Sequence, residues 1–289
     1  MKLLSGISEI SSNYDFYIFD VWGVIHDGIK LYPEVLNSLN YLRSLNKKIC
    51  FLSNAPRRAI KVKKLLEKFG ITEKLYDFII TSGEVAHIEL EKNQKNSFHN
   101  FGQKYFYIGP KKDMDLLDDL SYISVENAKE ADFAITTGFD NENSVLSEKL
   151  PYLLEAKNHD LPMLCVNPDL IVIRQDGKEM ICAGILALEY EKNGGRVIYY
   201  GKPFSKVYET VYEMFNKPSK NKIIAIGDGL ETDINGANEF KIDNILVTGG
   251  ILSNKLGIKF WQNPEEKKLI SLCSEINTFP KFSISNLKI

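Results

Sequence analysis

The segment that most constrains the fold of this 289-residue chain is Tyr14–Val24, where an apolar β-type run ends in a carboxylate. Phe16–Phe19 has the character of a buried strand, Asp20 follows it directly, and Gly23 comes three residues later. Open α/β sheets place their chemistry at the carboxyl ends of such strands. An Asp at this position can also serve only to polarise a strand-to-helix turn. The remainder of the chain decides between these two interpretations.

Short β-type runs alternate with amphipathic helical patterns along the first third of the chain. Helices are predicted over residues 33–46 and 58–69, and further strands over residues 48–52 and 76–81. Short connections between alternating strands and helices are typical of a parallel sheet that is covered on both faces. The sequence therefore predicts an α/β fold built on a doubly wound parallel sheet.

The middle of the chain repeats this alternation with a set of elements of its own. A long helix is expected over residues 143–158, and strands are expected over residues 104–108, 132–136 and 162–166. Gln175-Asp176-Gly177 lies between two further β-type runs and is a strong hairpin-turn signal. We interpret this region as an inserted α/β cap domain that carries a hairpin.

The domain boundaries follow from where the first pattern stops and resumes. The cap is assigned to residues 84–191, and the core to residues 1–83 together with 192–289. Within the returning core segment, residues 196–200 are expected to form a strand of the core sheet, and residues 222–227 another. After Leu252 we expect one or two helices that pack on the core, with Trp261 and Leu269 as candidate contacts.

Composition excludes several classes of function. A net charge of −2 and a pI near 6.2 indicate that the protein lacks the excess positive charge that binding to nucleic acid or an anionic membrane requires. No apolar run approaches the roughly 20 residues of a membrane span, and residues 1–12 lack the pattern of a secretory signal. The sequence predicts a soluble cytoplasmic protein with reduced thiols, because its four cysteines form no CxxC pair; these are Cys50, Cys165, Cys182 and Cys273.

Several predicted strands end in polar residues of complementary chemistry. In a doubly wound sheet such strand ends face one crevice. Carboxylates that share a crevice repel each other unless a hard cation neutralises them, and Mg²⁺ is the usual occupant. Hydroxyl, amide and ammonium donors suit phosphoryl oxygens, and a carboxylate oxygen can attack phosphorus to form an aspartyl-phosphate. The residues concerned are Asp20, Ser53-Asn54, Lys202, and Asp228 with Asp233.

These motifs resemble those of the haloacid dehalogenase-like superfamily of phosphohydrolases, specifically its class IIA members. That class includes nucleotide phosphatases of the NagD type and pyridoxal phosphate phosphatases. The resemblance extends over nearly the whole chain, to about Leu252. In the core it rests on Phe19–Val24, Leu52-Ser53-Asn54, Tyr200–Pro203 and Gly227–Asp233. In the cap it rests on Gly138-Phe139-Asp140, Cys165–Asp169 and Ala183-Gly184.

The resemblance implies a role for each of the charged residues. Asp20 would be the nucleophile and a Mg²⁺ ligand, and Asp228 a second ligand. Asp233 would be a further ligand or the partner of one, although an Asp here could simply favour the positive end of the following helix. Lys202 would balance charge beside Asp20, and its plain alternative is an exposed loop lysine.

The resemblance also implies which residues meet the substrate. Ser53 and Asn54 would hold the phosphoryl group, with an ordinary turn as the simpler interpretation. Asn167 and Asp169 would face the substrate from the cap, although Asn167-Pro168-Asp169 is turn-like by itself. The implied substrate is a small phosphorylated metabolite, such as a nucleotide, sugar phosphate or cofactor phosphate. Homodimerisation through the cap is a further implication.

Trp22 departs from the family pattern in one consequential way. Phosphatases of this family carry a second Asp there, which serves as general acid and then general base. The backbone carbonyl of Trp22 can still bind Mg²⁺, and its ring can wall off the site from water. The missing proton relay is worth roughly 10²–10⁴-fold in rate. His26 and Asp27 are candidate substitutes, or else structural partners of the turn.

Three hypotheses follow from this pattern. The favoured one is a Mg²⁺-dependent phosphatase that forms an aspartyl-phosphate on Asp20. The second is a phosphotransferase, or a slow enzyme with a long-lived intermediate, because Trp22 supplies no base for water attack. The third is a phosphate-ligand-binding protein that keeps the site without turnover.

Overall fold

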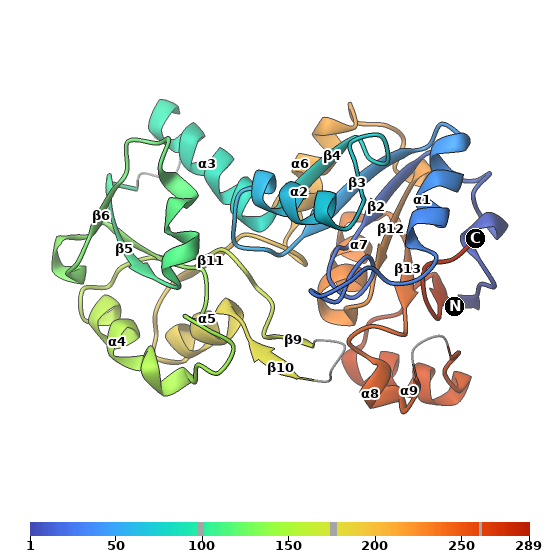
Figure 1. Cartoon of the computed structure of the whole chain (residues 1–289). Coiled ribbons are helices and arrows are strands. Elements are labelled where there is room, and N and C mark those ends of the chain that lie inside the picture. Colours follow the sequence, from blue (N-terminus) through green and yellow to red (C-terminus); the bar gives the residue numbers. More distant parts are fainter. Residues whose placement is uncertain (97–100, 174–177, 260–261) are drawn as a thin grey trace.

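Two α/β units of unequal size make up the chain, and the larger one contains both termini (Figure 1). The structure, a computed structural model, describes residues 1–96, 101–173, 178–259 and 262–289. Both ends of the chain build the larger unit, the core, and the middle of the chain builds the smaller unit, the cap. Helix α3 (Ser82–Asn96) leads from the core into the cap.

The core is organised around a parallel sheet of seven strands in the order β1-β14-β13-β12-β2-β3-β4. Every neighbouring pair in this order is parallel, so the predicted doubly wound sheet is confirmed. The strands are β1 (Lys2–Leu3), β2 (Phe16–Phe19), β3 (Lys48–Ser53), β4 (Phe78–Thr81), β12 (Ile223–Gly227), β13 (Asp243–Val247) and β14 (Phe282–Ile284).

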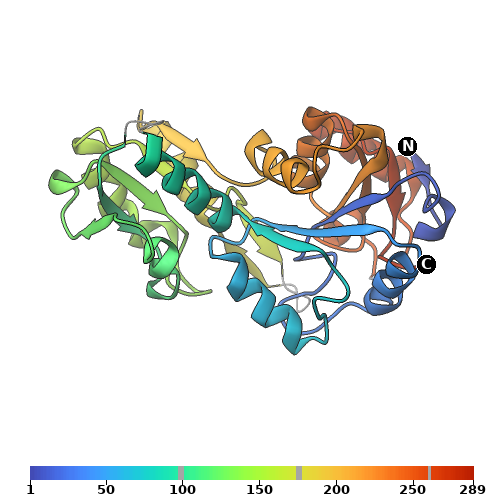
Figure 2. The same cartoon turned by 90° about the horizontal axis from the view of Figure 1, so that it is seen from above.

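Helices cover both faces of the core sheet, as Figure 2 shows from above. Side chains alternate between the faces of a strand. Within β2, Tyr17 and Phe19 therefore pack with α1 and α2, whereas Ile18 packs with α3, α6 and α7. The bounds of these helices are α1 (Val35–Ser44), α2 (Ala59–Lys68), α6 (Ser205–Met214) and α7 (Asn235–Phe240).

The cap has its own five-stranded parallel sheet in the order β11-β8-β7-β5-β6. The strands predicted over 104–108, 132–136 and 162–166 are present to within one residue at each end. The cap strands are β5 (Lys104–Ile108), β6 (Ile123–Val125), β7 (Phe133–Thr136), β8 (Met163–Cys165) and β11 (Val197–Tyr199). Two helices, α4 (Leu150–Asn158) and α5 (Ala183–Lys192), belong to this unit.

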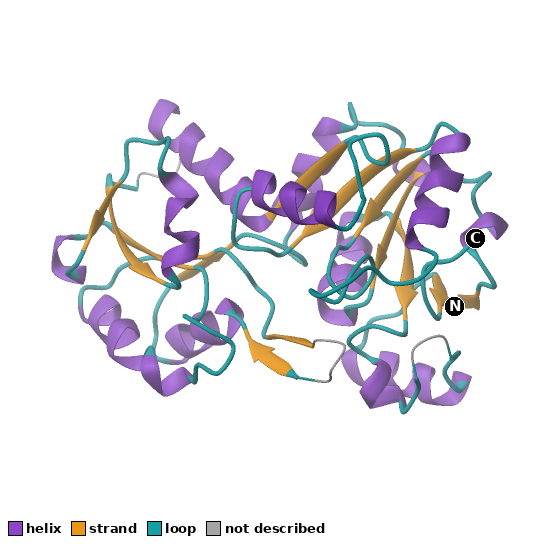
Figure 3. Ribbon diagram, in the orientation of Figure 1, coloured by secondary structure: helices purple, strands orange, loops and turns teal. Residues whose placement is uncertain are grey.

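The predicted hairpin forms a separate two-stranded sheet that projects from the cap toward the core (Figure 3). Its strands are β9 (Ile171–Ile173) and β10 (Glu179–Ile181), and Ile171 lies opposite Ile181 in antiparallel register. The predicted turn, Gln175-Asp176-Gly177, lies outside the described residues.

The second domain boundary, expected at residue 191, is wrong. Residues 197–199, expected in the core sheet, form β11, which pairs in parallel with β8 at the edge of the cap sheet. The cap therefore extends to Tyr199. A short apolar run carries no information about which of two sheets will accept it, because both offer the same backbone hydrogen bonds.

The helix expected over residues 143–158 is also shorter than predicted. The α-helix begins only at Leu150, after a 3-10 turn at Leu146–Glu148. Pro151 lies in its first turn, a position that suits proline because the N–H it lacks would have no helical partner. Upstream, Asn141 accepts a hydrogen bond from the Asn143 amide, which holds a turn instead of a helix.

The chain beyond Leu252 forms α8 (Ser253–Leu256) and α9 (Glu266–Ile276). Leu269 is buried among apolar residues of the core, which confirms it as a contact, whereas Trp261 lies outside the described residues. The terminal strands β1 and β14, which extend the core sheet at one edge, were not predicted from the sequence.

Two observations bear on the exclusions drawn from composition. All four cysteines are free thiols, three of them buried and Cys182 half-buried. Among the described helices, none is both long and apolar enough to span a membrane.

Candidate active site

Three buried carboxylates meet at the carboxyl edge of the core sheet. Asp20 directly follows β2, and Asp228 directly follows the neighbouring strand β12. Asp233 belongs to the π-helical turn η6 (Leu230–Ile234) that comes next. One carboxylate oxygen from each residue lies within 4.8 Å of the others. The predicted grouping of these three residues is therefore present in the fold.

Backbone geometry holds two of these carboxylates in place. The Ile251 amide donates a hydrogen bond of 2.7 Å to Asp228 Oδ2, and the Gly229 amide donates one of 3.1 Å to Asp233 Oδ2. Gly23 has a φ of +87°, and a Cβ at this position would overlap the Asp228 carboxylate. A side chain at Gly23 would thus be strained and would displace Asp228.

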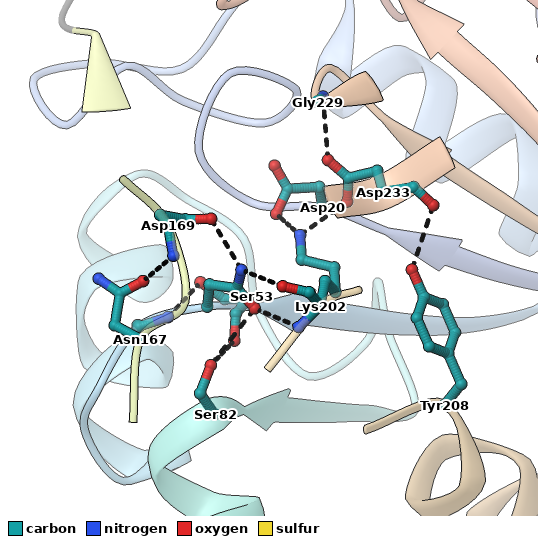
Figure 4. Close-up of polar contacts among 11 residues, drawn as sticks. Asp20, Ser53, Ser82, Asn167, Asp169, Lys202, Tyr208, Gly229 and Asp233 are labelled. Atoms are coloured by element: carbon teal, nitrogen blue, oxygen red, sulfur yellow. Dashed lines mark hydrogen bonds and ion pairs between the residues drawn. The ribbon is translucent and has the colours of Figure 1, made fainter. Parts of the chain in front are cut away.

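Lys202 lies between two of the three carboxylates (Figure 4). Its Nζ contacts Asp20 Oδ1 and lies 2.7 Å from Asp233 Oδ1. The Tyr208 hydroxyl donates a hydrogen bond of 3.1 Å to the Asp233 carbonyl oxygen from α6. Lys202 was expected at the end of a core strand, but it follows the cap strand β11 and enters the site on the loop that returns to the core.

The electrostatics of the cluster favour a bound cation. Burial raises the pKa of Asp20 well above its ordinary value. The positive charge of Lys202 acts in the opposite direction, and the negative charges of Asp233 and Asp228 add to the increase. Burial and Asp233 raise the pKa of Asp228 to about 7. Burial alone would lower the pKa of Lys202, but Asp20 and Asp233 hold it well above its ordinary value. Three carboxylates with a single ammonium group make a hard oxygen donor set, which fits a divalent cation.

The side-chain amide of Asn54 bonds both to the cap and to the backbone of Lys202. Its Nδ2 donates to Asp169 Oδ1 at 2.8 Å and to the Lys202 carbonyl oxygen at 3.0 Å, while its Oδ1 accepts from the Lys202 amide at 2.7 Å. Ser53, at the end of β3, accepts a hydrogen bond on Oγ from the Ala55 amide at 3.2 Å. The predicted phosphoryl contact of Asn54 stays a prediction, and its side chain would have to release one of these partners to make it.

The cap contributes the predicted pair Asn167 and Asp169 to the same cavity. Asn167 Oδ1 accepts a hydrogen bond of 3.1 Å from the Asp169 amide, so the segment is a turn as its sequence suggests. Burial raises the pKa of Asp169 to about 6, against the effect of Lys202 and the Asn54 hydrogen bond. The turn contacts the core through Asp169, and its predicted role in substrate binding stays a prediction.

Trp22 lines the cavity, and its indole N–H donates to the Ile173 carbonyl oxygen of the cap hairpin at 2.9 Å. His26 accepts a hydrogen bond of 2.9 Å on Nδ1 from the Gly28 amide, and burial lowers the pKa of its imidazole to about 4. Asp27 Oδ1 accepts hydrogen bonds from the amides of residues 29 and 30. Both candidates for proton transfer therefore support the loop, which favours the structural interpretation.

A cavity of about 940 Å³ between cap and core is lined by all the predicted site residues, and its wall also includes residues that the sequence did not single out. Arg57 follows Asn54 by three residues, and this spacing in a predicted site loop could have marked it. Its Nε lies 3.5 Å from Asp113 of the cap. Tyr32 and the apolar residues of β9 and β10 carry no chemical signature in sequence.

Comparisons with known proteins agree with this geometry. Residues 17–123 match a family model described as haloacid dehalogenase-like hydrolase, and residues 199–266 match one described as HAD-hydrolase-like. The sugar-phosphatase AraL of Bacillus subtilis (strain 168) is 26% identical over 239 residues, which cover 81% of this chain and 82% of that protein. Phosphoglycolate phosphatase 2 of Arabidopsis thaliana is 24% identical over 273 residues, covering 86% and 87% respectively.

Solved structures are also similar over the full length. The hydrolase of the haloacid dehalogenase-like family from Brucella suis 1330 superimposes with a TM-score of 0.82. It is 26% identical in sequence, and the match covers 99% of this chain and 100% of that one. The similarity therefore includes the cap as well as the core.

Proposed function

Because this chain belongs to the haloacid dehalogenase-like hydrolases, we propose that it is a class IIA, Mg²⁺-dependent phosphatase of small phosphomonoesters. The observation that carries the proposal is the position of Asp20, buried at a strand end beside Lys202 and within reach of two further carboxylates. Two relatives that match most of the chain are named phosphatases, one for sugars and one for phosphoglycolate. The substrate is a nucleotide, sugar phosphate or cofactor phosphate.

Asp20 is the nucleophile in this proposal. One of its carboxylate oxygens attacks phosphorus, the ester P–O bond breaks, and the electron pair leaves on the ester oxygen. Water then attacks the aspartyl-phosphate, which releases phosphate and restores Asp20. Lys202 compensates the charge of Asp20 throughout, while Ser53 and the neighbouring loop amides bind phosphoryl oxygens.

The proposed Mg²⁺ would be held by Asp20 and Asp228, with Asp233 and the Trp22 backbone carbonyl as further ligands. When bound, it would neutralise the carboxylate cluster and withdraw charge from the phosphoryl oxygens. The raised pKa values of Asp20 and Asp228 support this assignment, because they report repulsion and burial that a divalent cation would relieve.

Trp22 supports an alternative, namely a phosphotransferase or a low-turnover phosphate-binding protein. Its indole N–H is engaged with the Ile173 carbonyl oxygen, and an indole offers no group that can act as general acid or base. An aspartyl-phosphate formed here would lose the usual help for water attack. An acceptor more nucleophilic than water would then compete better for the phosphoryl group.

Phosphate release from p-nitrophenyl phosphate and a panel of alkyl and nucleoside phosphates, with and without Mg²⁺, tests the proposal. We expect Mg²⁺-dependent turnover that is lost in Asp20→Asn. Failure of every ester to react, with Mg²⁺ bound, would contradict the phosphatase. A stoichiometric burst of leaving group with a phosphorylated chain in intact-mass spectra would instead favour the transferase.

Trp22→Asp should increase turnover of alkyl phosphates by about 10²-fold or more relative to p-nitrophenyl phosphate, because it restores a general acid for a poor leaving group. The measurement is the ratio of kcat values for the two ester types in native and variant protein. Native protein that already hydrolyses both types equally well would show that another group supplies the proton.

Dimerisation through the cap stays a prediction, and light scattering of the purified protein would test it.

A further inference from the structure

Trp22 joins the catalytic edge of the core to the hairpin of the cap. It lies two residues after Asp20, and its Nε1 lies 2.9 Å from the carbonyl oxygen of Ile173 in β9. The ring packs edge-on against His26, with centroids 5.6 Å apart. Gly28 has a φ of +90°, and a Cβ there would overlap the indole. The indole therefore has a defined position between the nucleophile and the hairpin.

The hairpin presents apolar side chains to the cavity beside Trp22. Ile171, Ile173, Met180 and Ile181 line the cavity, and all four are half-buried. The groups proposed to bind the metal and the phosphoryl group, in contrast, include Asp20, Lys202 and Asp233, which lie close together at the end of the core sheet (Figure 4). Half-buried apolar side chains in a cavity wall gain further burial when an apolar ligand group covers them.

Two acidic side chains elsewhere in the cavity wall, Asp140 and Glu142, are already paired with lysines. Lys149 Nζ lies 2.7 Å from Asp140, and Lys178 Nζ lies 2.8 Å from Glu142. Arg57 faces Asp113 at 3.5 Å. A polar substrate group would have to compete with these ion pairs, whereas an apolar group would leave them intact.

We propose that Trp22 and the β9–β10 hairpin form an apolar subsite for the organic group of the substrate. The enzyme then prefers phosphate monoesters of apolar alcohols to sugar phosphates of the same size. Trp22 is a positioning residue in this subsite, because its N–H holds the hairpin beside Asp20. The inference rests on the proposed function, since it assigns the leaving-group side of the same site.

Cyclohexylmethyl phosphate and glucose 6-phosphate form a suitable pair of probes, because they share a six-membered ring and an exocyclic CH₂–O–phosphate and differ in ring polarity. Each is measured as a competitive inhibitor of p-nitrophenyl phosphate turnover in the presence of Mg²⁺. We expect at least about tenfold tighter binding of the cyclohexylmethyl ester. Inorganic phosphate, which has no organic group, serves as the reference for the phosphoryl site.

Met180→Gln places a polar group of similar size in the hairpin and should reduce the preference severalfold without changing inhibition by inorganic phosphate. Met114→Gln is the matched control, since Met114 is an exposed cap residue outside the cavity wall. Trp22→Phe keeps an aromatic ring but removes the N–H. It should weaken binding of the cyclohexylmethyl ester and leave inorganic phosphate binding unchanged.

Equal or tighter binding of glucose 6-phosphate would overturn the inference while leaving the phosphatase intact. A preference that Met180→Gln and Met114→Gln affect alike would overturn it too. If the protein hydrolyses no ester at all, the proposed function fails, and calorimetry with the same two ligands and Mg²⁺ still decides whether the subsite is apolar.

Discussion

Lys202 illustrates how strongly single side chains depend on one another in this site. It is 3% exposed, and its ammonium group is shared by Asp20 and Asp233. Removing one partner from a buried set of charges leaves the others uncompensated, which costs more than the loss of one contact. In the proposed mechanism, Asp20 can stay ionised as the nucleophile only while this ammonium group, or a cation, is nearby.

Lys202→Met should therefore lower kcat by about 10²–10³, since it removes a charge that stabilises the reacting centre. Lys206→Met in the following helix α6 is a suitable control, because Lys206 pairs with Glu89 outside the carboxylate cluster. Steady-state kinetics with p-nitrophenyl phosphate compare the two variants. A Lys202→Met protein with native kcat would remove Lys202 from the mechanism.

His26 should make the folded state sensitive to acid. Burial lowers its pKa from 6.5 to about 4, so between these values the unfolded chain binds a proton that the folded protein does not. Stability is therefore lost as the pH falls from 6.5 to 4, by about 3 kcal/mol in total. His26→Asn removes the titrating group and can still accept the Gly28 hydrogen bond.

Urea denaturation of both proteins at pH 7, 6, 5 and 4 measures this difference. The native protein should lose about 3 kcal/mol more of its free energy of unfolding than His26→Asn over that interval. Parallel curves for the two proteins would show that another group accounts for acid sensitivity.

Among the secondary-structure elements, α9 supports the site from outside. Leu269 packs against Leu230 and Ile234 of η6, the turn that carries Asp233. Leu256 of α8 belongs to the same apolar cluster. The C-terminal helices thus hold the acidic turn against the sheet, although they contribute no polar group to the carboxylate cluster.

Leu269→Ala should destabilise the protein by about 2–5 kcal/mol, because it removes a buried side chain and leaves a cavity beside η6. Ile270→Ala on the same helix is the control, since Ile270 is 44% exposed and should change stability little. Chemical denaturation gives the free energy of unfolding of each. Similar values for both variants would mean that α9 does not support the core as described.

Over the molecule as a whole, polar contacts from several elements hold the cap on the core. Asn54 bonds to Asp169, Lys61 Nζ lies 2.6 Å from Asp115, and Arg58 lies 3.1 Å from Asp119. The Trp22 contact with Ile173 adds a further link between the two units. The site is therefore completed by the relative position of two units, and metal binding to the carboxylates should stabilise the folded chain globally.

If the carboxylate cluster holds Mg²⁺ as proposed, Mg²⁺ should raise the melting temperature of the native protein, because it would bind the folded state and not the unfolded one. At 100 times Kd the gain is about 2.7 kcal/mol. Asp228→Asn should gain much less from Mg²⁺. Without the metal, at pH 8, the Asp228→Asn protein should be at least as stable as the native protein. The reason is that the pKa of Asp228 is raised in the folded state, so its ionisation at pH 8 opposes folding.

Thermal unfolding of both proteins over a Mg²⁺ titration tests this, with Asp243→Asn as the matched control at an acidic residue of the neighbouring strand outside the cluster. Equal Mg²⁺ shifts in native protein and Asp228→Asn would remove Asp228 from the metal site.

Much of the core was predictable because its signals are local. An apolar run followed by Asp20, and another followed by Asp228, each indicate a buried strand that ends in a carboxylate. A parallel sheet then places both residues at one edge, whatever the details of packing. The grouping of Asp20, Asp228 and Asp233 needed no further information, and the family resemblance rests on these same short segments.

The sequence by itself determined the fold class, the carboxylate cluster and the existence of an inserted cap, since these follow from strand and helix periodicity and from local turns. Only the tertiary structure decided that β11 joins the cap sheet, that Asn54 bonds to Asp169, and that the Trp22 indole meets Ile173. These three depend on contacts between residues 115 to 151 positions apart, or between strands with interchangeable backbone partners. No local pattern encodes such pairings, because they are selected by the packing energy of the whole chain.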